Sequence, residues 1–201
     1  MTLALPSAAT PAPKRQALVA VGVLSVAAIT LMGGMLSMWL RFRAAAPTRS
    51  SSDGLYQIKD WLPKDITIPE VAANTMLATF FALLLMAQWA CYSAKRGHDS
   101  HRSLALLVTF GLSAAIVNAQ IAVYSQMGIG VRDGAYQTMF YAITATMLIL
   151  VVTGMVFTAV TWFRSVGGRR DDVEVVNAHA LYWYVLTAIF VALWFVVYVQ
   201  K

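Results

Sequence analysis

Five long apolar stretches dominate the pattern of hydrophobic and polar positions along the chain. Each is long enough to cross a bilayer as a helix, which takes about 20 apolar residues. No stretch keeps the alternation of apolar and polar residues that is typical of a membrane β-barrel strand. The pattern therefore predicts an all-α, polytopic membrane protein built as a bundle of five transmembrane helices. The expected helices cover residues of about 17–40, 71–92, 104–124, 135–163 and 180–199.

The polar segments between these helices define the rest of the organisation. Residues 1–16 are rich in Ala, Pro and Ser, and we expect a disordered tail there, followed by one membrane domain over 17–201. The first apolar run ends in SMWLRFR rather than in a cleavage site, which favours a retained helix over a signal peptide. The segment 41–70 is long for a connection between two helices, so we expect it to contact a partner.

Composition and charge agree with a membrane location. Hydrophobic residues make up 59% of the 201 residues, and charged residues only 12%, whereas soluble domains have about 45–50% and about 25%. The net charge is +6, but the basic residues lie at helix ends and in loops, which indicates lipid contact and topology rather than nucleic-acid binding. Their concentration in short loops predicts a cytoplasmic N-terminus and an outer C-terminus.

The stretch CYSAKRGHDSHR holds the only cysteine and two of the three histidines. Cys91, His98 and His101 offer three candidate ligands, whereas a structural zinc site takes four in characteristic pairs. Gly97 and Asp99 favour a turn between two helices. We therefore interpret the stretch as a solvated cytoplasmic turn, with Cys91 as a small buried hydrophobe.

The interiors of the expected helices contain no Asp, Glu, Lys, Arg or His. Ionisable residues inside a membrane usually mark proton or ion pathways, and a membrane haem needs axial ligands such as His within its helices. His179 is expected just before the fifth helix, at the inner interface. The pattern argues against a pump, a haem site or a catalytic centre carried by this chain.

Four tryptophans fall near the expected helix ends, which is typical of an interfacial aromatic belt. They are Trp39, Trp89, Trp162 and Trp183.

Three stretches together resemble subunit III of haem–copper terminal oxidases in its short five-helix bacterial form. They are YSAKRG followed by TFGLSAAIVNAQIAVY, then GAYQTMFYAIT, and finally LYWYVLTAIFVALWFVVYV. The resemblance covers roughly residues 17–201, and the helix count and loop lengths agree with it. The residues that match the family's motifs are Gln120, Tyr124, Tyr136, Phe140, Tyr141, Thr144, Tyr182 and Trp183.

The chain departs from that family at its ionisable positions. The family usually carries Glu, His or Asp at six places where this chain has neutral residues, so it resembles a divergent subunit III or a paralogue. These residues are Ala28, Val123, Met147, Leu150, Tyr184 and Thr187.

The resemblance implies a non-catalytic subunit of a cytochrome c oxidase in the bacterial cytoplasmic membrane. Such a subunit binds no metal or haem, packs on the catalytic subunit I that holds haem and copper, and retains phospholipid between its helices. The whole complex reduces oxygen with electrons from cytochrome c and pumps protons. Candidate lipid contacts are the basic and aromatic interface residues Trp89, Arg96, Arg102 and Trp162.

Other functions stay open at the level of the sequence. An accessory subunit of a nitric oxide reductase would share the five-helix frame. A small channel or transporter would need a polar pathway or helices interrupted by Gly or Pro, and the runs lack internal Pro. An unrelated assembly or scaffold protein is a further alternative.

Overall fold

The computed structural model describes residues 15–51, 53–63, 66–168 and 173–200, so residues 1–14 of the expected tail lie outside it. Within this part of the chain, five helices are long and apolar enough to cross a membrane, which confirms the predicted fold class. The elements are α1 (Gln16–Ala45), β1 (Thr48–Ser50), β2 (Gln57–Lys59), α2 (Glu70–Lys95), α3 (Asp99–Met127), α4 (Ala135–Val166), α5 (Val173–Leu193) and the π-helix η1 (Trp194–Val199).

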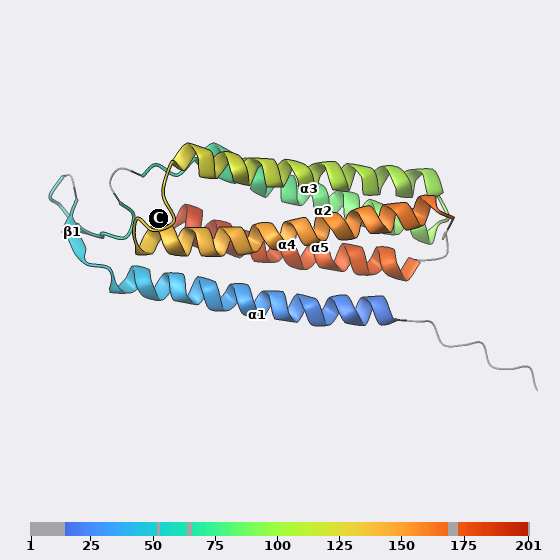
Figure 1. Ribbon diagram of the computed structural model, residues 1–201, viewed down its shortest axis with the longest axis horizontal. Coiled ribbons are helices and arrows are strands. Elements are labelled where there is room, and N and C mark those ends of the chain that lie inside the picture. The colour runs from blue at the N-terminus through green and yellow to red at the C-terminus, as the bar shows by residue number, and fades with distance from the viewer. Residues whose placement is uncertain (1–14, 52, 64–65, 169–172, 201) are drawn as a thin grey trace, which may run out of the picture.

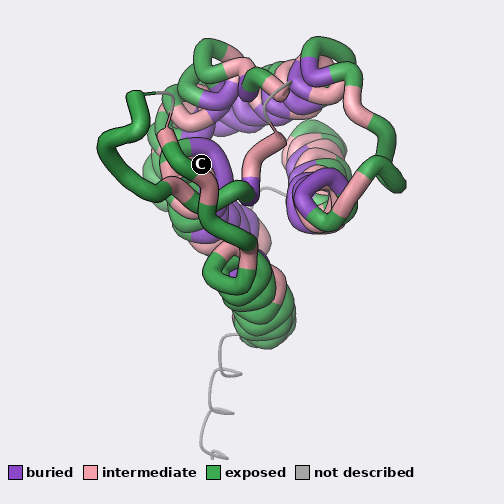
Figure 2. The backbone as a smooth tube through the Cα atoms, turned by 90° about the vertical axis from the view of Figure 1, so that its left-hand side faces the viewer, coloured by how far each residue is buried: buried purple, intermediate pink, exposed green. Residues whose placement is uncertain are grey.

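Consecutive helices run in opposite directions, and four of them close into a bundle (Figure 1). Helix α2 packs on α3, α3 on α4, α4 on α5, and α5 back on α2. Helix α1 lies outside this bundle against α5 and α4, and most of its surface is exposed (Figure 2). Its buried residues form one narrow stripe, at the three- and four-residue spacings of a single helix face. They are Val21, Ser25, Met32, Leu36 and Trp39.

The two ends of the bundle differ in their connections. The loop end carries the segments 46–69 and 128–134 together with the last described residue (Figure 1). The turn end carries the start of α1 and the tight turn between α2 and α3, where Gly97 has a φ of 71°. The His98 amide donates to the Ser93 carbonyl oxygen at 3.0 Å. Most of CYSAKRGHDSHR is therefore helical, because α2 and α3 both extend into it.

Helix α5 begins at Val173, and the expected start near residue 180 was wrong. Glu174 lies in its first turn, where a carboxylate interacts favourably with the helix dipole. The Glu174 carboxylate also accepts hydrogen bonds from the backbone amides of Ala17 and Leu18, at 2.8 and 3.3 Å. These contacts fix the start of α5 beside the start of α1, and they place His179 inside a helix rather than before it.

The long connection at the loop end is folded. Strands β1 and β2 pair antiparallel, with Thr48 opposite Lys59. The Lys59 ammonium donates to the carbonyl oxygens of Ala44 and Ala46 at 2.9 and 3.1 Å, which satisfies acceptors left open at the end of α1. This contact anchors the hairpin to the end of α1.

Candidate functional site

Six of the eight motif residues lie close together in the half of the bundle nearer the loop end. The Tyr124 hydroxyl, on α3, donates to Thr144 Oγ1, on α4, at 2.8 Å. The rings of Tyr124 and Tyr141 lie 4.9 Å apart, and Phe140 is fully buried beside them. Gln120 Oε1 accepts from the Tyr198 hydroxyl at 3.4 Å. Tyr136 stacks on Phe140, and this cluster joins α3, α4 and η1.

Tyr182 and Trp183 lie in a second contact, between α5 and α4. The Tyr182 hydroxyl donates to the Leu150 carbonyl oxygen at 2.7 Å. A Cβ atom placed on Gly154 would lie 2.7 Å from Tyr182 and 2.9 Å from Trp183. Glycine is therefore required for the close approach of the two helices at this point.

His179 lies beside this contact and is fully buried. Its Nε2 atom is 2.8 Å from Thr158 Oγ1, and the Trp183 indole nitrogen lies 3.1 Å from both atoms. His179 thus lies within α5, and the expected position just before the fifth helix was wrong. The criterion of an uninterrupted apolar run excluded Glu174 and Asn177, although an acidic residue before an apolar run also indicates a helix start.

Arg102 does not lie at the lipid surface, where we expected it. Its side chain is buried, and Nε donates to Ser165 Oγ at 2.8 Å while NH2 forms an ion pair with Asp99 at 2.9 Å. The neighbouring Trp162 donates from Nε1 to Ser103 Oγ at 2.9 Å and stays half-buried. The Ser165 bond joins α3 to α4, as does the bond from Trp162 to Ser103, so Arg102 connects two helices within the protein.

Arg96 and Trp89 remain accessible at the turn end. Arg96 is exposed and lies over the Tyr92 ring, 4.2 Å from its centroid. Trp89 is half-buried, and its ring lies 5.8 Å from that of His101. Cys91, by contrast, is buried and donates from Sγ to the Val176 carbonyl oxygen at 3.3 Å. Across the described residues, no group of three or more His, Cys, Asp or Glu is placed to hold a metal ion.

Two of the four tryptophans assigned to the interfacial belt belong to the core. Trp39 and Trp183 are buried almost completely. Trp39 packs against Trp61 and Tyr136, with ring centroids 5.2 Å away in both cases. The folded connection at the loop end thus covers Trp39 through Trp61. The apolar pattern of the sequence did not reveal this burial.

The neutral residues at the family's ionisable positions have packing roles. The Tyr184 hydroxyl donates to Gln88 Oε1 at 2.8 Å and so joins α5 to α2. Val123, Met147 and Thr187 are buried. Ala28 and Leu150 are half-buried. The arrangement can hold helices together through neutral hydrogen bonds, each of which contributes about 0.6 kcal/mol in membrane proteins.

Comparison with known proteins identifies this arrangement. The model of one protein family, cytochrome c oxidase subunit III, matches residues 59–201. This range contains all of α2, α3, α4 and α5. No curated protein matches the chain. Because the family match covers well over half of the sequence, the chain belongs to the cytochrome c oxidase subunit III family.

Proposed function

We propose that the chain is a non-catalytic subunit of a haem–copper cytochrome c oxidase in the aerobic respiratory chain of a bacterium. It packs on catalytic subunit I and supports the assembly, lipid binding and stability of that subunit. The observation that carries this proposal is the family match over α2–α5. Haem and copper then belong to the partner subunits.

The neutral contacts between helices support a mechanical role. Three hydrogen bonds join three pairs of neighbouring helices. Tyr124 bonds to Thr144 between α3 and α4, and Tyr184 bonds to Gln88 between α5 and α2. The third bond runs from Tyr182 to the Leu150 carbonyl oxygen, between α5 and α4. These three contacts hold neighbouring helices together without placing a charge between them, which would be costly in a membrane. The bundle presents a fixed apolar surface on which a partner subunit and lipids can pack.

The ends of the helices give the proposed orientation. Arg96 and Trp89 at the turn end have the chemistry of contacts with anionic headgroups. The turn end then faces the cytoplasm, and the loop end, with the C-terminus, faces outward in the bacterial inner membrane. Arg102 is withdrawn from this set because its side chain is buried.

Disruption of the gene, with complementation by the intact gene, tests the proposal. We expect membranes of the disrupted strain to lose haem a absorbance and oxygen uptake driven by reduced cytochrome c. The initial rate per remaining haem a should stay unchanged, because the chain supplies no reacting group, but activity should decay sooner during turnover. Normal haem a content with unaltered, lasting activity would contradict the proposal.

A further inference from the structure

Asn118 places a polar amide on the outer surface of a membrane helix. It is exposed on α3, which packs on α2 and α4 and lies on the side of the bundle away from α1 (Figure 1). At about 1.5 Å per residue, Asn118 is about 8 Å from the centre of this helix, Asp99–Met127. The hydrocarbon layer reaches about 15 Å to either side of its own centre. With α3 centred in the bilayer, the amide therefore lies at the depth of the hydrocarbon.

Two other exposed polar side chains at such depth have partners within the chain. The Thr30 hydroxyl donates to the Val26 carbonyl oxygen at 2.9 Å, and Gln88 accepts from Tyr184 at 2.8 Å. The side chain of Asn118 forms no hydrogen bond within the part of the chain that the structure describes. The hydrocarbon layer holds no water to satisfy an amide, and an amide without a partner there is costly. Because acyl chains neither donate nor accept hydrogen bonds, the exposed amide points to a partner on another protein chain.

The residues around Asn118 permit another helix to come close. Ala114, Ala115 and Ala122 lie three or four residues away and share its face of α3, where Ala114 and Ala115 are exposed and Ala122 is half-buried. Small side chains allow the backbones of membrane helices to approach each other closely. Residues 103–127 contain no charged residue, so two such faces can meet without repulsion between like charges.

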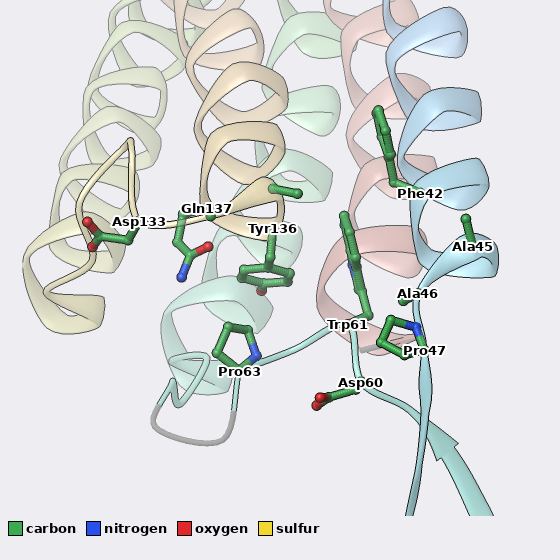
Figure 3. A pocket seen from close by; sticks show the side chains of 12 residues that line it. Phe42, Ala45, Ala46, Pro47, Asp60, Trp61, Pro63, Asp133, Tyr136 and Gln137 are labelled. Atoms are coloured by element: carbon green, nitrogen blue, oxygen red, sulfur yellow. The ribbon is translucent and has the colours of Figure 1, made fainter.

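The folded connection at the loop end leaves this face open. Trp61 packs against Trp39 on α1 and Tyr136 on α4. Helix α4 lies between Trp61 and α3 (Figure 3). The connection therefore covers α1 and α4 rather than the outer face of α3, which agrees with the exposure of Asn118.

We propose that two copies of the chain pair through α3, with Asn118 of one copy opposite Asn118 of the other. Both copies cross the membrane in the same direction, because the sequence sets the orientation. A twofold axis along the bilayer normal then brings each residue at the centre of this face opposite its own counterpart. An amide carries both donors and an acceptor, so the two Asn118 side chains satisfy each other. A single Asn in an apolar helix face also fixes the register of pairing.

This pairing goes beyond the proposed function, and its test does not depend on other subunits. The full chain, fused to a fluorescent protein, is reconstituted in lipid vesicles, and single-molecule photobleaching counts the copies in each complex. We expect a fraction with two bleaching steps that rises with the protein-to-lipid ratio. Asn118→Leu removes the amide and should weaken pairing about fivefold. A parent chain that stays monomeric, or equal pairing of the parent and Asn118→Leu, would overturn the proposal.

Matched variants separate recognition by the amide from other effects. Asn118→Gln keeps an amide and should retain most of the pairing. Thr30→Leu also removes an exposed polar group, but from α1 on the opposite side of the bundle (Figure 1), so pairing should not change. Asn118→Leu should keep the unfolding temperature of the parent in detergent, because Asn118 forms no side-chain hydrogen bond within the described chain. Equal loss of pairing in Thr30→Leu and Asn118→Leu would overturn the role of Asn118.

Cross-linking in native membranes tests the geometry of the pair. The native Cys91 is buried, whereas Ala114→Cys places a thiol on the exposed face, one helical turn from Asn118. We expect mild oxidation to link two copies through Ala114→Cys but not through Leu31→Cys, a matched variant at an exposed position of α1. Cross-linking of Ala114→Cys to a different protein in place of a second copy would show that another subunit covers this face, and would overturn the proposal.

Discussion

Tyr184 illustrates how a neutral residue can join two membrane helices. Its hydroxyl donates to Gln88 Oε1 at 2.8 Å, at a position where the subunit III resemblance implies a histidine. Thr144 has a similar role, because its hydroxyl accepts from Tyr124 and donates to the Phe140 carbonyl oxygen. At the scale of residues, the chain keeps its contacts between helices while it lacks ionisable groups at these positions.

Gly154 gives the sharpest test at this scale. Substitution by Ala places a Cβ 2.7 Å from the Tyr182 ring, and such overpacking typically costs about 1–3 kcal/mol. We expect Gly154→Ala to lower the unfolding temperature in detergent. The matched control is Gly111→Ala on α3, where a Cβ meets nothing within 4 Å and Ala is the better helix former. Equal unfolding temperatures for the two variants would contradict the packing described for α4 and α5.

Substitutions of Arg102 and Arg96 are expected to have opposite effects on stability and on lipid binding. Arg102→Met removes the bonds to Ser165 and Asp99, and we expect it to lower the free energy of unfolding by about 1–3 kcal/mol. Arg96→Met alters an exposed side chain, so it should leave stability unchanged and weaken the binding of anionic phospholipid. Thermal unfolding and lipid retention, measured on both variants, check this pair. If Arg102→Met leaves stability unchanged and weakens lipid binding instead, the buried position of Arg102 is contradicted.

At the scale of elements, the sequence predicted the helices well and their ends poorly. Long apolar runs identify membrane helices because the bilayer demands length and composition. The first turns of α5 escaped detection because Glu174, Asn177 and His179 interrupt the apolar pattern. The polar groups of Glu174 and His179 have partners on other elements, at Ala17 and Thr158 respectively. Contacts of this kind depend on tertiary structure, which periodicity does not report.

The candidate site was predictable only in part for the same reason. The motif residues could be named from the resemblance, but Thr158 was not recognised, although it follows Gly154 at the four-residue spacing that is typical of close helix contacts. Trp61 escaped because the connection 46–69 has no periodic pattern. The burial of Trp39 and Tyr136 depends on how that connection folds over them.

Glu174 predicts how α1 is attached to the bundle. Its carboxylate accepts from the amides of Ala17 and Leu18, which the first turn of a helix leaves without partners in the helix. We expect Glu174→Ala to speed hydrogen exchange at these two amides while exchange in α3 stays slow. Glu174→Gln keeps an acceptor oxygen and should have the smaller effect. Unchanged exchange in Glu174→Ala would show that this contact does not fix α1.

At the scale of the whole molecule, the chain divides into the range that matches the family and the residues before it. Helix α1 and strand β1 lie before residue 59, outside the matched range. Helix α1 is also the most exposed of the five membrane helices. The helices within the matched range are therefore those of the bundle α2–α5. Helix α1 is attached to this bundle through Glu174, and the hairpin is attached to the end of α1 through Lys59.

The hairpin predicts a role in assembly rather than in the fold. Leu55 and Tyr56 at its tip are 83% and 59% exposed, and exposed apolar groups outside the membrane often mark protein contacts. We expect replacement of residues 51–56 by Asn-Gly to leave thermal stability unchanged but to reduce the amount of partner subunit that co-purifies. An unchanged amount of co-purified partner subunit with the shortened hairpin would contradict this role.

The central claim is membership of an oxidase complex, and one measurement tests it most directly. The tagged full chain is purified from its native membranes in mild detergent, and a redox difference spectrum of the eluate is recorded. We predict haem a absorbance together with an oxidase catalytic subunit. A spectrum of b- and c-type haem with nitric oxide reductase subunits, or a colourless and solitary protein, would contradict the account.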